Sequence, residues 1–572
     1  MARLYHLKIQ HFRGIESFEQ TFETGITCII GRGDSGKSTI LEAIAFVFSQ
    51  SWSIHLNDSD FFRCDTSIPI IIEGTIVNVP DELISKFDSH LRGISKDGRF
   101  IDDMELEDAD NDNTQTALTI QLKVTKDLEP SWSVVSNNGI EPSQIKANDR
   151  AKLNVFAVSD YTDRHFSLNK GNPLYSLYKQ LDNSDIIGEE NRVLEVIREA
   201  KDAFDSSVGA KFDVVILKIK DTAGTLGLPL NEMKAMLDHR DIAISENKVS
   251  IHENGIPFRL KGKGSKRLLS LAIQLALTQP SGVILIDEIE QGLEPDRVQH
   301  LVNVLAKNSD KQIIITTHSS NVITEIPCNT LFIMRNGAGK LLHVEGELQG
   351  SIRKNPEAFF AKKVLVCEGA TELGFCRALN NFRISQNLKS ATCNGVRFAD
   401  GTGSKMAEYV KGFNDLKYDT ALFCDSDAES LNTQKSSFSD VGIQIIDCDD
   451  NLALEQQVFC DVSWDTIKKL IMLAVQKIKE DDNKLEEEAM KSVYDRTNSC
   501  LQNKMTSMND WYSNENKELR SALGLAAKRG EWYKRQSYGE MMGDIILSHY
   551  DELSDRCILK TEIDAISKWI DS

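Results

Sequence analysis

Two apolar segments in the C-terminal half of the sequence run directly into acidic side chains. They are "KKVLVCEGATE" (362–372) and "ALFCDSDAE" (421–429), and both read as buried strands. The acids at their ends are Glu368, Glu372, Asp425 and Asp427. Carboxylates gathered at one edge of a sheet would repel one another unless cations lay between them, and oxygen ligands suit Mg²⁺ or Mn²⁺. The pattern predicts a site for two such ions, of the kind that activates water in phosphodiester cleavage.

The elements around these acids bring them to a common edge. A further strand, "VRFAD" (396–400), precedes a Gly-rich turn and a helix, so strands and helices alternate from residue 362 onward. This alternation predicts a parallel sheet, in which the C-terminal ends of the strands share one edge. A lone D-x-D also occurs as a solvated strand end, but the upstream E-G-x-T-E favours a metal site. The turn residues Asp400, Ser404 and Lys405 either shape this site or form a tight connection.

A second motif that could do chemistry lies near the N-terminus. The segment "GRGDSGKS" (31–38) has the spacing G-x-x-x-x-G-K-S, between an apolar strand and an apolar helix of period 3.6. The N–H groups of such a loop cradle phosphates, Lys37 would reach the β and γ phosphates of ATP, and Ser38 would hold Mg²⁺. The residues expected at the phosphates are Gly31, Gly33, Asp34, Ser35, Gly36, Lys37, Ser38 and Thr39.

A later apolar strand, within "GVILIDEIEQGLEPD" (282–296), also ends in acids. Asp287 fits a partner of Mg²⁺, and Glu288 fits a base for the attacking water. Strands often end in acids, so this motif alone is weak. Together with the loop at 31–38 it indicates an ATPase.

Three further features accompany the two ATPase motifs. A Gly/Ser-rich turn opens a helix in "LKGKGSKRLLSLAIQLAL" (260–277), "EQGLEPD" follows the second strand, and "KQIIITTHSSNV" (311–322) contains a strand that ends at His318. Their order resembles the ABC-type ATPase heads of recombination and chromosome-maintenance proteins. The resemblance implies that Ser265 and Lys266 lie in a signature turn that caps the ATP of a second protomer, and that His318 senses the γ-phosphate. It therefore also implies a homodimer or a higher homo-oligomer formed through the heads.

The acidic segments resemble the Toprim fold of topoisomerases, primases and some nucleases. An ABC head followed by a Toprim domain resembles the Old (overcoming lysogenization defect) family of nucleases, which includes the nuclease subunit of the Gabija system. The resemblance implies a two-metal DNA endonuclease that nicks or cleaves DNA in anti-phage defence, with a helicase-like partner. It gives the role of metal ligand to Glu368, Glu372, Asp425, Asp427 and Glu455. Less favoured alternatives to Glu455 are Asp447, Asp449 and Asp450.

The same family uses a C-terminal lysine to stabilise charge at the scissile phosphate. The segment "GLAAKRGEWYKRQSYGE" (524–540) offers Lys528 and Lys534, and either lysine also fits a basic surface that touches the DNA backbone. An aromatic pair precedes Lys534 and would anchor it, which favours Lys534 slightly. Lys528 is the alternative candidate for this role.

The chain of 572 residues is too long for one core, so we expect at least two α/β domains. Residues 1–355 are expected to form an ABC-type P-loop ATPase domain, with a helical dimerisation insertion around 160–240. Residues 356–572 are expected to form a Toprim domain with a parallel sheet and a helical C-terminal part. Residues 187–208 look helical, and the acidic segment 101–115 reads as an exposed loop.

Composition narrows the function classes. The net charge of −20 argues against a general nucleic-acid coat protein but not against an enzyme with a local basic groove. No stretch approaches the ~20 apolar residues that span a bilayer, and the N-terminus lacks the features of a signal peptide. The eleven scattered cysteines never form C-x-x-C, which favours reduced thiols and a cytoplasmic location.

Other function classes fit less well. The main alternative is a non-catalytic, ATP-dependent DNA clamp or sensor that recruits partners through its Toprim domain, but such a module has no need of metal-suited carboxylates. A primase is disfavoured because no zinc ribbon is present. A topoisomerase is disfavoured because no tyrosine stands in a strand-passage context.

Overall fold

The structure of the chain is a computed structural model, and it describes most of the sequence. The described residues are 2–101, 114–137, 139–158, 165–167, 172–174, 176–177, 209–237, 249–277, 282–307, 311–427, 429–449, 451–509, 511–513 and 515–572. The helix expected over 187–208 lies outside them, as does most of the acidic segment 101–115. The two described ends of that segment belong to strands rather than to a loop.

The chain divides into two compact units, Met1–Val344 and Glu345–Ser572. The first unit contains a six-stranded sheet in the order β10-β14-β15-β3-β16-β17. Its strands are Val155–Val158 (β10), Val283–Ile286 (β14), Gln312–Thr316 (β15), Gly25–Ile30 (β3), Leu331–Ile333 (β16) and Leu342–His343 (β17). All neighbours are parallel except β16 and β17. The central strands are almost continuously apolar because both faces of a parallel sheet are buried.

A second, antiparallel sheet of eight strands completes the core of the first unit. Its strands are Arg3–Phe12 (β1), Ile15–Thr21 (β2), Ile70–Val77 (β4), Arg92–Ser95 (β5), Phe100–Ile101 (β6), Thr114–Val124 (β7), Pro130–Val135 (β8) and Ser143–Gln144 (β9). Helix α1 (Lys37–Val47) joins the two sheets, since its buried side chains and those of β1, β4 and β7 form one apolar cluster. The apolar period of this helix therefore matches its buried face.

Among its described residues, the first unit also contains a three-stranded antiparallel sheet and six further α-helices. That sheet consists of Met233–Leu237 (β11), Val249–Glu253 (β12) and Ile256–Pro257 (β13). The helices are Asp81–Lys86 (α2), Ala147–Ala151 (α4), Gly209–Thr225 (α7), Lys263–Leu277 (α8), Pro295–Ala306 (α9) and Ser320–Glu325 (α10). Only part of the insertion expected around 160–240 is described, and it contains α7 and β11.

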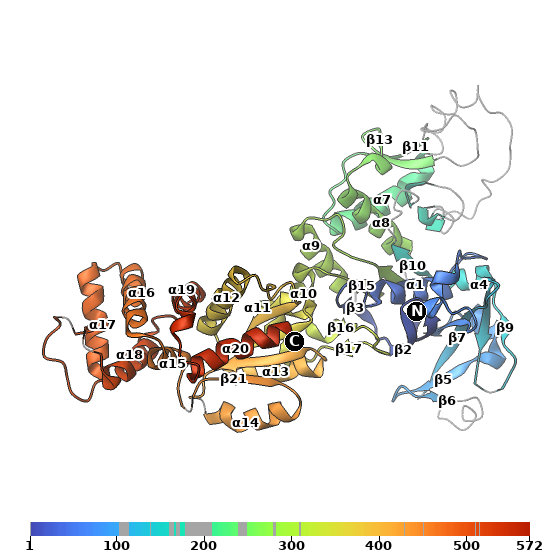
Figure 1. The fold of residues 1–572 in the computed structure, drawn as a ribbon. Coiled ribbons are helices and arrows are strands. Elements are labelled where there is room, and N and C mark those ends of the chain that lie inside the picture. The colour runs from blue at the N-terminus through green and yellow to red at the C-terminus, as the bar shows by residue number, and fades with distance from the viewer. Residues whose placement is uncertain are drawn as a thin grey trace. The chain divides into compact units, whose positions relative to one another are not determined.

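The second unit is built on a four-stranded parallel sheet in the order β19-β18-β20-β21. The strands are Lys363–Cys367 (β18), Val396–Asp400 (β19), Asp419–Cys424 (β20) and Gln444–Asp447 (β21). The chain leaves β18 toward one side and β20 toward the other, so helix α12 (Ala370–Ser385) covers one face while α13 (Met406–Asp415) and α14 (Glu429–Asp440) cover the opposite face (Figure 1). The β18–β20 pair is therefore the point at which the strand order reverses, where ligands bind in open α/β sheets.

Helices surround this sheet. They are Gln349–Lys354 (α11), Leu454–Asp461 (α15), Trp464–Asp482 (α16), Glu486–Cys500 (α17), Lys517–Gly530 (α18), Gln536–Leu547 (α19) and Ile558–Asp571 (α20). The apolar faces of α15 to α20 join those of β18, β20 and α12 in one core. The C-terminal helices therefore belong to the domain that contains the sheet. Within the described ranges, no helix is both long and apolar enough to cross a membrane.

Candidate functional site

The loop between β3 and α1 carries the lysine expected at the phosphates of ATP. Lys37 begins α1, and its Nζ donates to the carbonyl oxygens of Gly31 and Arg32 at 3.0 and 2.8 Å. Burial lowers the pKa of Lys37, and the nearby charge of Asp287 opposes that shift. Gly31 has a φ of 156°, and a Cβ there would lie 2.5 Å from the carbonyl oxygen of Met334, so the loop requires glycine at this position.

The acid that follows β14 directly meets this loop. Ser38 Oγ donates to Asp287 Oδ1 at 3.1 Å, and Thr316 Oγ1 donates to the same oxygen at 2.5 Å. Ser38 and Asp287 are the two side chains expected to share Mg²⁺. The other residues expected at the phosphates lie in the loop, except for one in α1; they are Gly33, Asp34, Ser35, Gly36 and Thr39.

Glu288 has a backbone conformation that few residues other than glycine adopt, with a φ of 46°. Its N–H donates to Thr316 Oγ1 at 2.8 Å, and its carbonyl oxygen accepts from Arg267 Nη2 at 3.4 Å. Arg267 also donates to the carbonyl oxygen of Asp287. Backbone strain of this kind persists where the surroundings impose it, which is common at functional sites. The sequence motifs gave no signal for Arg267, a buried residue of α8.

The expected signature residues Ser265 and Lys266 lie in the first turn of α8, which begins at Lys263. This turn approaches the segment after β14 very closely. A Cβ added at Gly264 would lie 2.7 Å from the carbonyl oxygen of Gly292. The glycine is therefore required by the backbone contact between the two segments.

His318 lies just beyond β15 rather than at its end, since the strand stops at Thr316. Its side chain is exposed, and its backbone N–H donates to Glu290 Oε1 at 2.6 Å. No sequence motif indicated a role for Glu290.

The second candidate site lies at the C-terminal edge of the β18–β20 pair. Glu368 follows β18 directly, and its Oε2 accepts from the N–H of Asp425 at 2.9 Å. Glu372 lies in the first turn of α12, where its Oε2 accepts from the N–H of Gly369 at 2.8 Å. This is the capping bond that glutamate forms at the third position of a helix, and it keeps the carboxylate of Glu372 at the start of α12, beside Glu368.

Asp425 and Glu455 reach the same edge from distant parts of the second unit. Asp425 Oδ1 accepts from the N–H of Leu454 at 2.8 Å, and Glu455 is the next residue of α15. Glu455 Oε1 accepts from Thr371 Oγ1 of α12 at 3.4 Å. Only 7% of Asp425 and 2% of Glu455 is exposed. We refer below to the five acids at this edge as the acid set: Glu368, Glu372, Asp425, Asp427 and Glu455.

Burial and mutual repulsion favour the protonated form of the buried members of the acid set. Burial raises the pKa of Asp425 to about 8, and the charges of Glu368 and Glu455 add to the shift. Burial, followed by the charges of Asp425 and Glu455, raises the pKa of Glu372 well above its usual range. Burial also raises the pKa of Glu455. Perturbed carboxyl groups in one cluster are typical of functional sites.

Two lysines from the C-terminal region, Lys528 in α18 and Lys534 in the turn after it, approach the acid set. Lys534 follows Trp532 and Tyr533 in the turn that connects α18 to α19. The side chains of both aromatic residues are fully buried. Burial lowers the pKa of Lys534, but the surrounding carboxylates outweigh this effect and the pKa is raised. Lys528, in the last turn of α18, forms an ion pair with Asp427. The structure thus gives Lys528 a single partner within the set and Lys534 several neighbours.

A third lysine, which no sequence motif indicated, lies behind the D-x-D segment. Lys435 Nζ of α14 donates to Asp447 Oδ2 at 2.9 Å and lies 3.4 Å from both the carbonyl oxygen of Asp425 and Ser426 Oγ. Ser426 Oγ in turn donates to the carbonyl oxygen of Cys448 at 2.5 Å. Ser426 therefore ties the D-x-D segment to the residues after β21, and Asp447 already has a cationic partner.

The Gly-rich turn shapes the backbone beside the acid set. Gly403 N donates to the carbonyl oxygen of Glu368 at 2.8 Å. Asp400 Oδ2 pairs with Lys354 Nζ at 2.8 Å, and Lys405 pairs with a glutamate of α13 at 2.7 Å. Both charged side chains of the turn thus have ionic partners outside the acid set. Ser404 lies in the same turn.

The acid set fits a divalent cation by its chemistry. Glu368, Glu372 and Asp425 each use one carboxylate oxygen to accept a backbone N–H, so their orientations are fixed while the cluster stays rich in negative charge. In the described part of the chain, no three acidic, histidine or cysteine side chains are grouped as in a finished coordination shell. Of the alternatives to Glu455, Asp449 is described and Asp450 is not.

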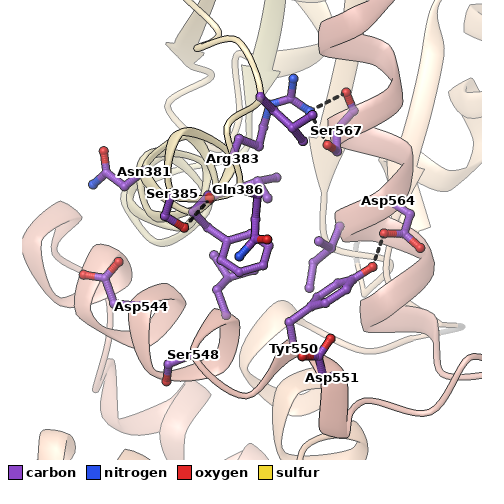
Figure 2. Close-up of a pocket in the computed structure, with 15 residues that line it drawn as sticks. Asn381, Arg383, Ser385, Gln386, Asp544, Ser548, Tyr550, Asp551, Asp564 and Ser567 are labelled. Atoms are coloured by element: carbon purple, nitrogen blue, oxygen red, sulfur yellow. Dashed lines mark hydrogen bonds between the residues drawn. The ribbon is translucent and has the colours of Figure 1, made fainter.

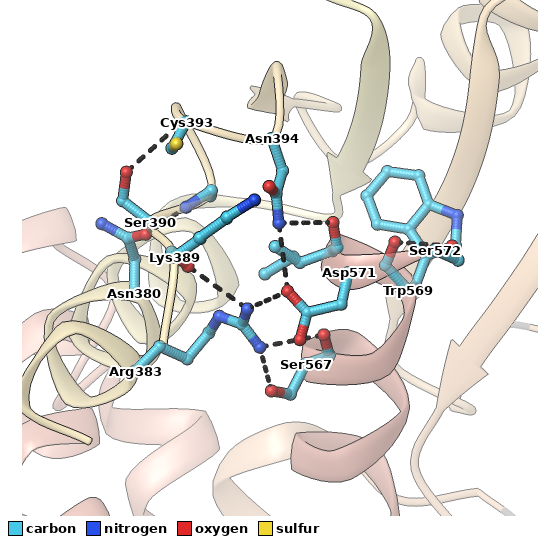
Figure 3. Close-up of polar contacts among 12 residues, drawn as sticks. Asn380, Arg383, Lys389, Ser390, Cys393, Asn394, Ser567, Trp569, Asp571 and Ser572 are labelled. Atoms are coloured by element: carbon cyan, nitrogen blue, oxygen red, sulfur yellow. Dashed lines mark hydrogen bonds and ion pairs between the residues drawn. The ribbon is translucent and has the colours of Figure 1, made fainter. Parts of the chain in front are cut away.

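The last helix, α20, supports α15 and is anchored at its own C-terminal end (Figure 3). Buried Arg383 of α12 donates through Nη1 to the carbonyl oxygen of Ser567 at 2.9 Å and pairs through Nη2 with Asp571 at 2.5 Å. A cation at a helix C-terminus is favourable because it meets the unpaired carbonyls there. At the other end of α20, Leu559 N donates to Asp461 Oδ2 of α15 at 2.9 Å.

A cavity of about 740 Å³ opens at the far end of α12 (Figure 2). Phe382 and Tyr550 line it together with the acids Asp544, Asp551 and Asp564, and the Tyr550 hydroxyl donates to Asp564. Helix α12 runs back from the C-terminal edge of β18, so the cavity lies away from the acid set. Its carboxylates disfavour a phosphate-bearing ligand.

Two family models match separate parts of the chain. A family model described as an AAA domain, putative AbiEii toxin, type IV TA system, matches residues 26–324. A model described as an overcoming lysogenization defect protein-like TOPRIM domain matches residues 359–427. ATPase and TOPRIM domains generally use Mg²⁺, which agrees with the chemistry of both candidate sites.

Individual relatives match more than half of the chain. The probable ATPase of retron Vc95 from Vibrio cholerae is 24% identical over an alignment of 390 positions, which covers 58% of this chain and 73% of that protein. The DNA replication and repair protein RecF of Streptococcus thermophilus is 22% identical over an alignment of 378 positions, which covers 58% of this chain and 97% of that protein. The solved Smc head domain of Pyrococcus furiosus is 16% identical and covers 62% of this chain and 98% of its own, with a TM-score of 0.36.

The expected fold class is confirmed: an ABC-type P-loop ATPase is followed by a Toprim domain with a parallel sheet and a helical C-terminal region. The AAA-domain model alone matches more than half of the 572 residues. The chain therefore belongs to that AAA-domain family, and the OLD-like TOPRIM domain that follows its ATPase domain supports the resemblance to the Old (overcoming lysogenization defect) family.

Proposed function

We propose that this protein is an ATP-binding, divalent-metal-dependent DNA endonuclease that nicks or cleaves phosphodiester bonds. The observation that carries the proposal is the acid set at the edge of the β18–β20 pair, in which Glu372, Asp425 and Glu455 are buried and have raised pKa values, with Lys534 nearby. The acid set would hold two Mg²⁺ or Mn²⁺ ions. Bound there, such a pair supplies an activated water and stabilises the leaving oxygen.

The protein's own groups would then orient and neutralise the reacting phosphate. Backbone N–H groups fix one carboxylate oxygen of each of Glu368, Glu372 and Asp425, and the other oxygens would be available to the ions. Lys534, fixed by two buried aromatic residues, would contact the scissile phosphate. Lys528 would be released from Asp427 when that carboxylate binds an ion.

The ATPase domain would bind and hydrolyse ATP with Mg²⁺. Lys37 would contact the β and γ phosphates, Ser38 and Asp287 would share the ion, and Glu288 would activate water. The exposed His318 would sense the γ-phosphate. Ser265 would cap the ATP of a second protomer, so we also propose a homodimer or higher homo-oligomer. By its family resemblance the protein would act in the cytoplasm in anti-phage defence, as in the Gabija subgroup, with a helicase-like partner.

Cleavage of supercoiled plasmid DNA by the full-length protein tests the proposal, with Mg²⁺, Mn²⁺ or Ca²⁺ and with or without ATP. We expect cleavage with Mg²⁺ or Mn²⁺, and a loss of at least about 1,000-fold in Asp425→Ala because the ions lose a buried ligand. Asp440→Ala is the matched control, since Asp440 is an exposed carboxylate at the end of α14. Both variants should bind ATP as the wild type does.

Two outcomes would contradict the proposal in different ways. Full cleavage by Asp425→Ala would refute the acid set as the active site. If the wild type cleaves no DNA with any of the three ions, a non-catalytic ATP-dependent DNA clamp or sensor becomes the better account. The ion pair between Lys528 and Asp427 is the observation that would then favour the clamp, because a lysine already occupies one of the carboxylates.

A further inference from the structure

Glu290 lies two residues after Glu288, and its carboxylate bonds the segment that carries His318. Its Oε2 accepts from Thr317 Oγ1 at 2.7 Å, and its Oε1 accepts from the N–H of His318 at 2.6 Å. Glu290 is half-buried and Thr317 is fully buried. One charged acceptor thus holds two consecutive residues, with bonds stronger than those between neutral groups.

The bond from Thr317 has a defined direction. Thr317 Oγ1 accepts from the N–H of Ser319 at 2.9 Å, and a threonine hydroxyl has a single proton to donate. That proton goes to Glu290. The backbone from Thr317 to Ser319 therefore depends on one glutamate, which must supply acceptors to both the hydroxyl and the N–H of His318.

Two more hydrogen bonds join the two residues before Glu290 to Thr316. Glu288 N donates to Thr316 Oγ1 at 2.8 Å, and Ile289 N donates to the carbonyl oxygen of Thr316 at 3.1 Å. Residues 288–290 and 316–318 therefore form one hydrogen-bonded unit. Glu290 closes this unit at the end where His318 lies, and Glu288 lies at the other end.

We infer that Glu290 is a positioning residue for ATP hydrolysis, which holds the backbone of His318 in a fixed place relative to Glu288. The inference rests on the roles proposed above for Glu288 and His318. Because the direction of a side chain follows its backbone, releasing this segment would move the imidazole, and a shift of ~1 Å in a catalytic group lowers a rate by up to ~100-fold. ATP affinity should change little, since Glu290 acts on His318 and not on the nucleotide.

The test compares Glu290→Gln, Glu290→Ala, His318→Ala and the double variant in the full-length protein. Glutamine keeps the shape, but its NH₂ group cannot accept from either donor. We expect Glu290→Gln to lower kcat for ATP hydrolysis by about 10-fold and Glu290→Ala by about 30-fold, with the Kd for ATP within about twofold. Because Glu290 acts through His318, Glu290→Ala combined with His318→Ala should be no slower than His318→Ala alone.

Matched variants separate positioning from loss of stability. Glu325→Ala should keep the wild-type kcat, because Glu325 ends α10 and accepts from Asn303 Nδ2 at 3.1 Å, outside the bonded unit. Thr317→Val removes one of the two bonds to Glu290 at nearly constant volume and should cost about threefold in kcat, whereas Thr317→Ser keeps the hydroxyl. Hydrogen exchange at the His318 amide, which needs no turnover, should be faster in Glu290→Gln.

Several results would overturn the inference. One is a double variant whose loss is the product of the two single losses, since Glu290 would then act independently of His318. Another is a reduced kcat in Glu290→Gln beside an unchanged kcat in His318→Ala. A third is unchanged exchange at the His318 amide. If the wild type hydrolyses no ATP, the proposed ATPase roles fail, and the exchange rate alone then decides whether Glu290 holds this backbone.

Discussion

The two candidate sites differ in how their charges are compensated within the protein. In the nucleotide loop, Lys37 donates to two backbone carbonyls and Ser38 bonds Asp287, so the reactive groups have internal partners. In the acid set, burial raises the pKa values of Glu372, Asp425 and Glu455, and repulsion by neighbouring carboxylates adds to the shift of the first two. The reactive side chains of the nucleotide loop thus already have hydrogen-bond partners within the protein, whereas the acid set carries more negative charge than its surroundings neutralise.

Because of this difference, ATP and a divalent ion should affect the stability of their units in different ways. ATP would add to a loop whose hydrogen bonds already exist, and it would stabilise the first unit only by mass action. A divalent ion would also relieve repulsion among buried carboxylates, so its binding should change how the stability of the second unit depends on pH. The comparison can therefore be tested one site at a time.

Of the changes in ligand binding and stability that compare the two sites, the largest is expected at the nucleotide loop. Lys37→Ala removes the cation expected at the β and γ phosphates, and we expect the Kd for ATP to rise at least ~100-fold, or ~3 kcal/mol. A fluorescent ATP analogue measures this change, with Lys340→Ala, an exposed lysine in the turn after β16, as the control. Calorimetric titration with Mn²⁺ should show unchanged binding at the acid set. Lost Mn²⁺ binding in Lys37→Ala would mean that the two sites are not independent.

The next largest effect concerns the stability of the second unit. Mn²⁺ at about 100 times its Kd should stabilise this unit by ~3 kcal/mol, which raises its melting temperature by several degrees. In Asp425→Asn most of this shift should disappear, because the ion loses a buried ligand. Amide hydrogen exchange in β20 and α15, measured during heating, reports the unfolding of the second unit directly. An equal Mn²⁺ shift in the wild type and in Asp425→Asn would argue against the acid set as the binding site.

The pH dependence of stability without metal should be smaller but has a defined sign. The pKa of Asp425 is raised to about 8 from an unfolded value of ~4, so the folded state binds a proton that the unfolded state releases between these values. The resulting stabilisation is complete below pH ~4 and is lost as the pH rises through about 8. We expect a loss on the order of 1–3 kcal/mol between pH 5 and 8, measured by urea unfolding of the second unit. Asp425→Asn, or saturating Mn²⁺, should flatten the curve, and a rise in stability over this range would contradict the account.

The sequence predicted those parts of the two sites that depend on local pattern. The Gly-rich loop ending in Lys37 and Ser38 lies between a strand and a helix, as its spacing requires. The alternation of apolar strands and helices also predicted that Glu368 and Asp425 would meet at one edge of a parallel sheet. Both inferences follow from chain geometry over a few tens of residues, which sequence pattern records well.

Partners that depend on helix packing could not be predicted. Lys528 meets Asp427 across 101 residues, and Lys435 reaches Asp447 only because α14 lies against β21. The bonds from Glu290 to the His318 segment likewise depend on where β14 and β15 lie as neighbours. Lysine and glutamate on a surface helix usually indicate only a solvated face. No spacing rule therefore distinguishes these residues from their many neighbours of the same type.

The smallest expected effect separates the two C-terminal lysines. Lys528 pairs directly with Asp427, and an ion at that carboxylate would compete with it, so Lys528→Met should raise the affinity for Mn²⁺ by about threefold, the scale of a partly exposed ion pair. Lys534→Met should lower plasmid cleavage by more than about tenfold, because Lys534 adjoins most of the acid set. Lys517→Met, an exposed lysine at the start of α18, is the control for both measurements. Weaker Mn²⁺ binding in Lys528→Met would show instead that the lysine holds Asp427 in place for the ion, and the acid set would then be already arranged for the ion by its protein partners.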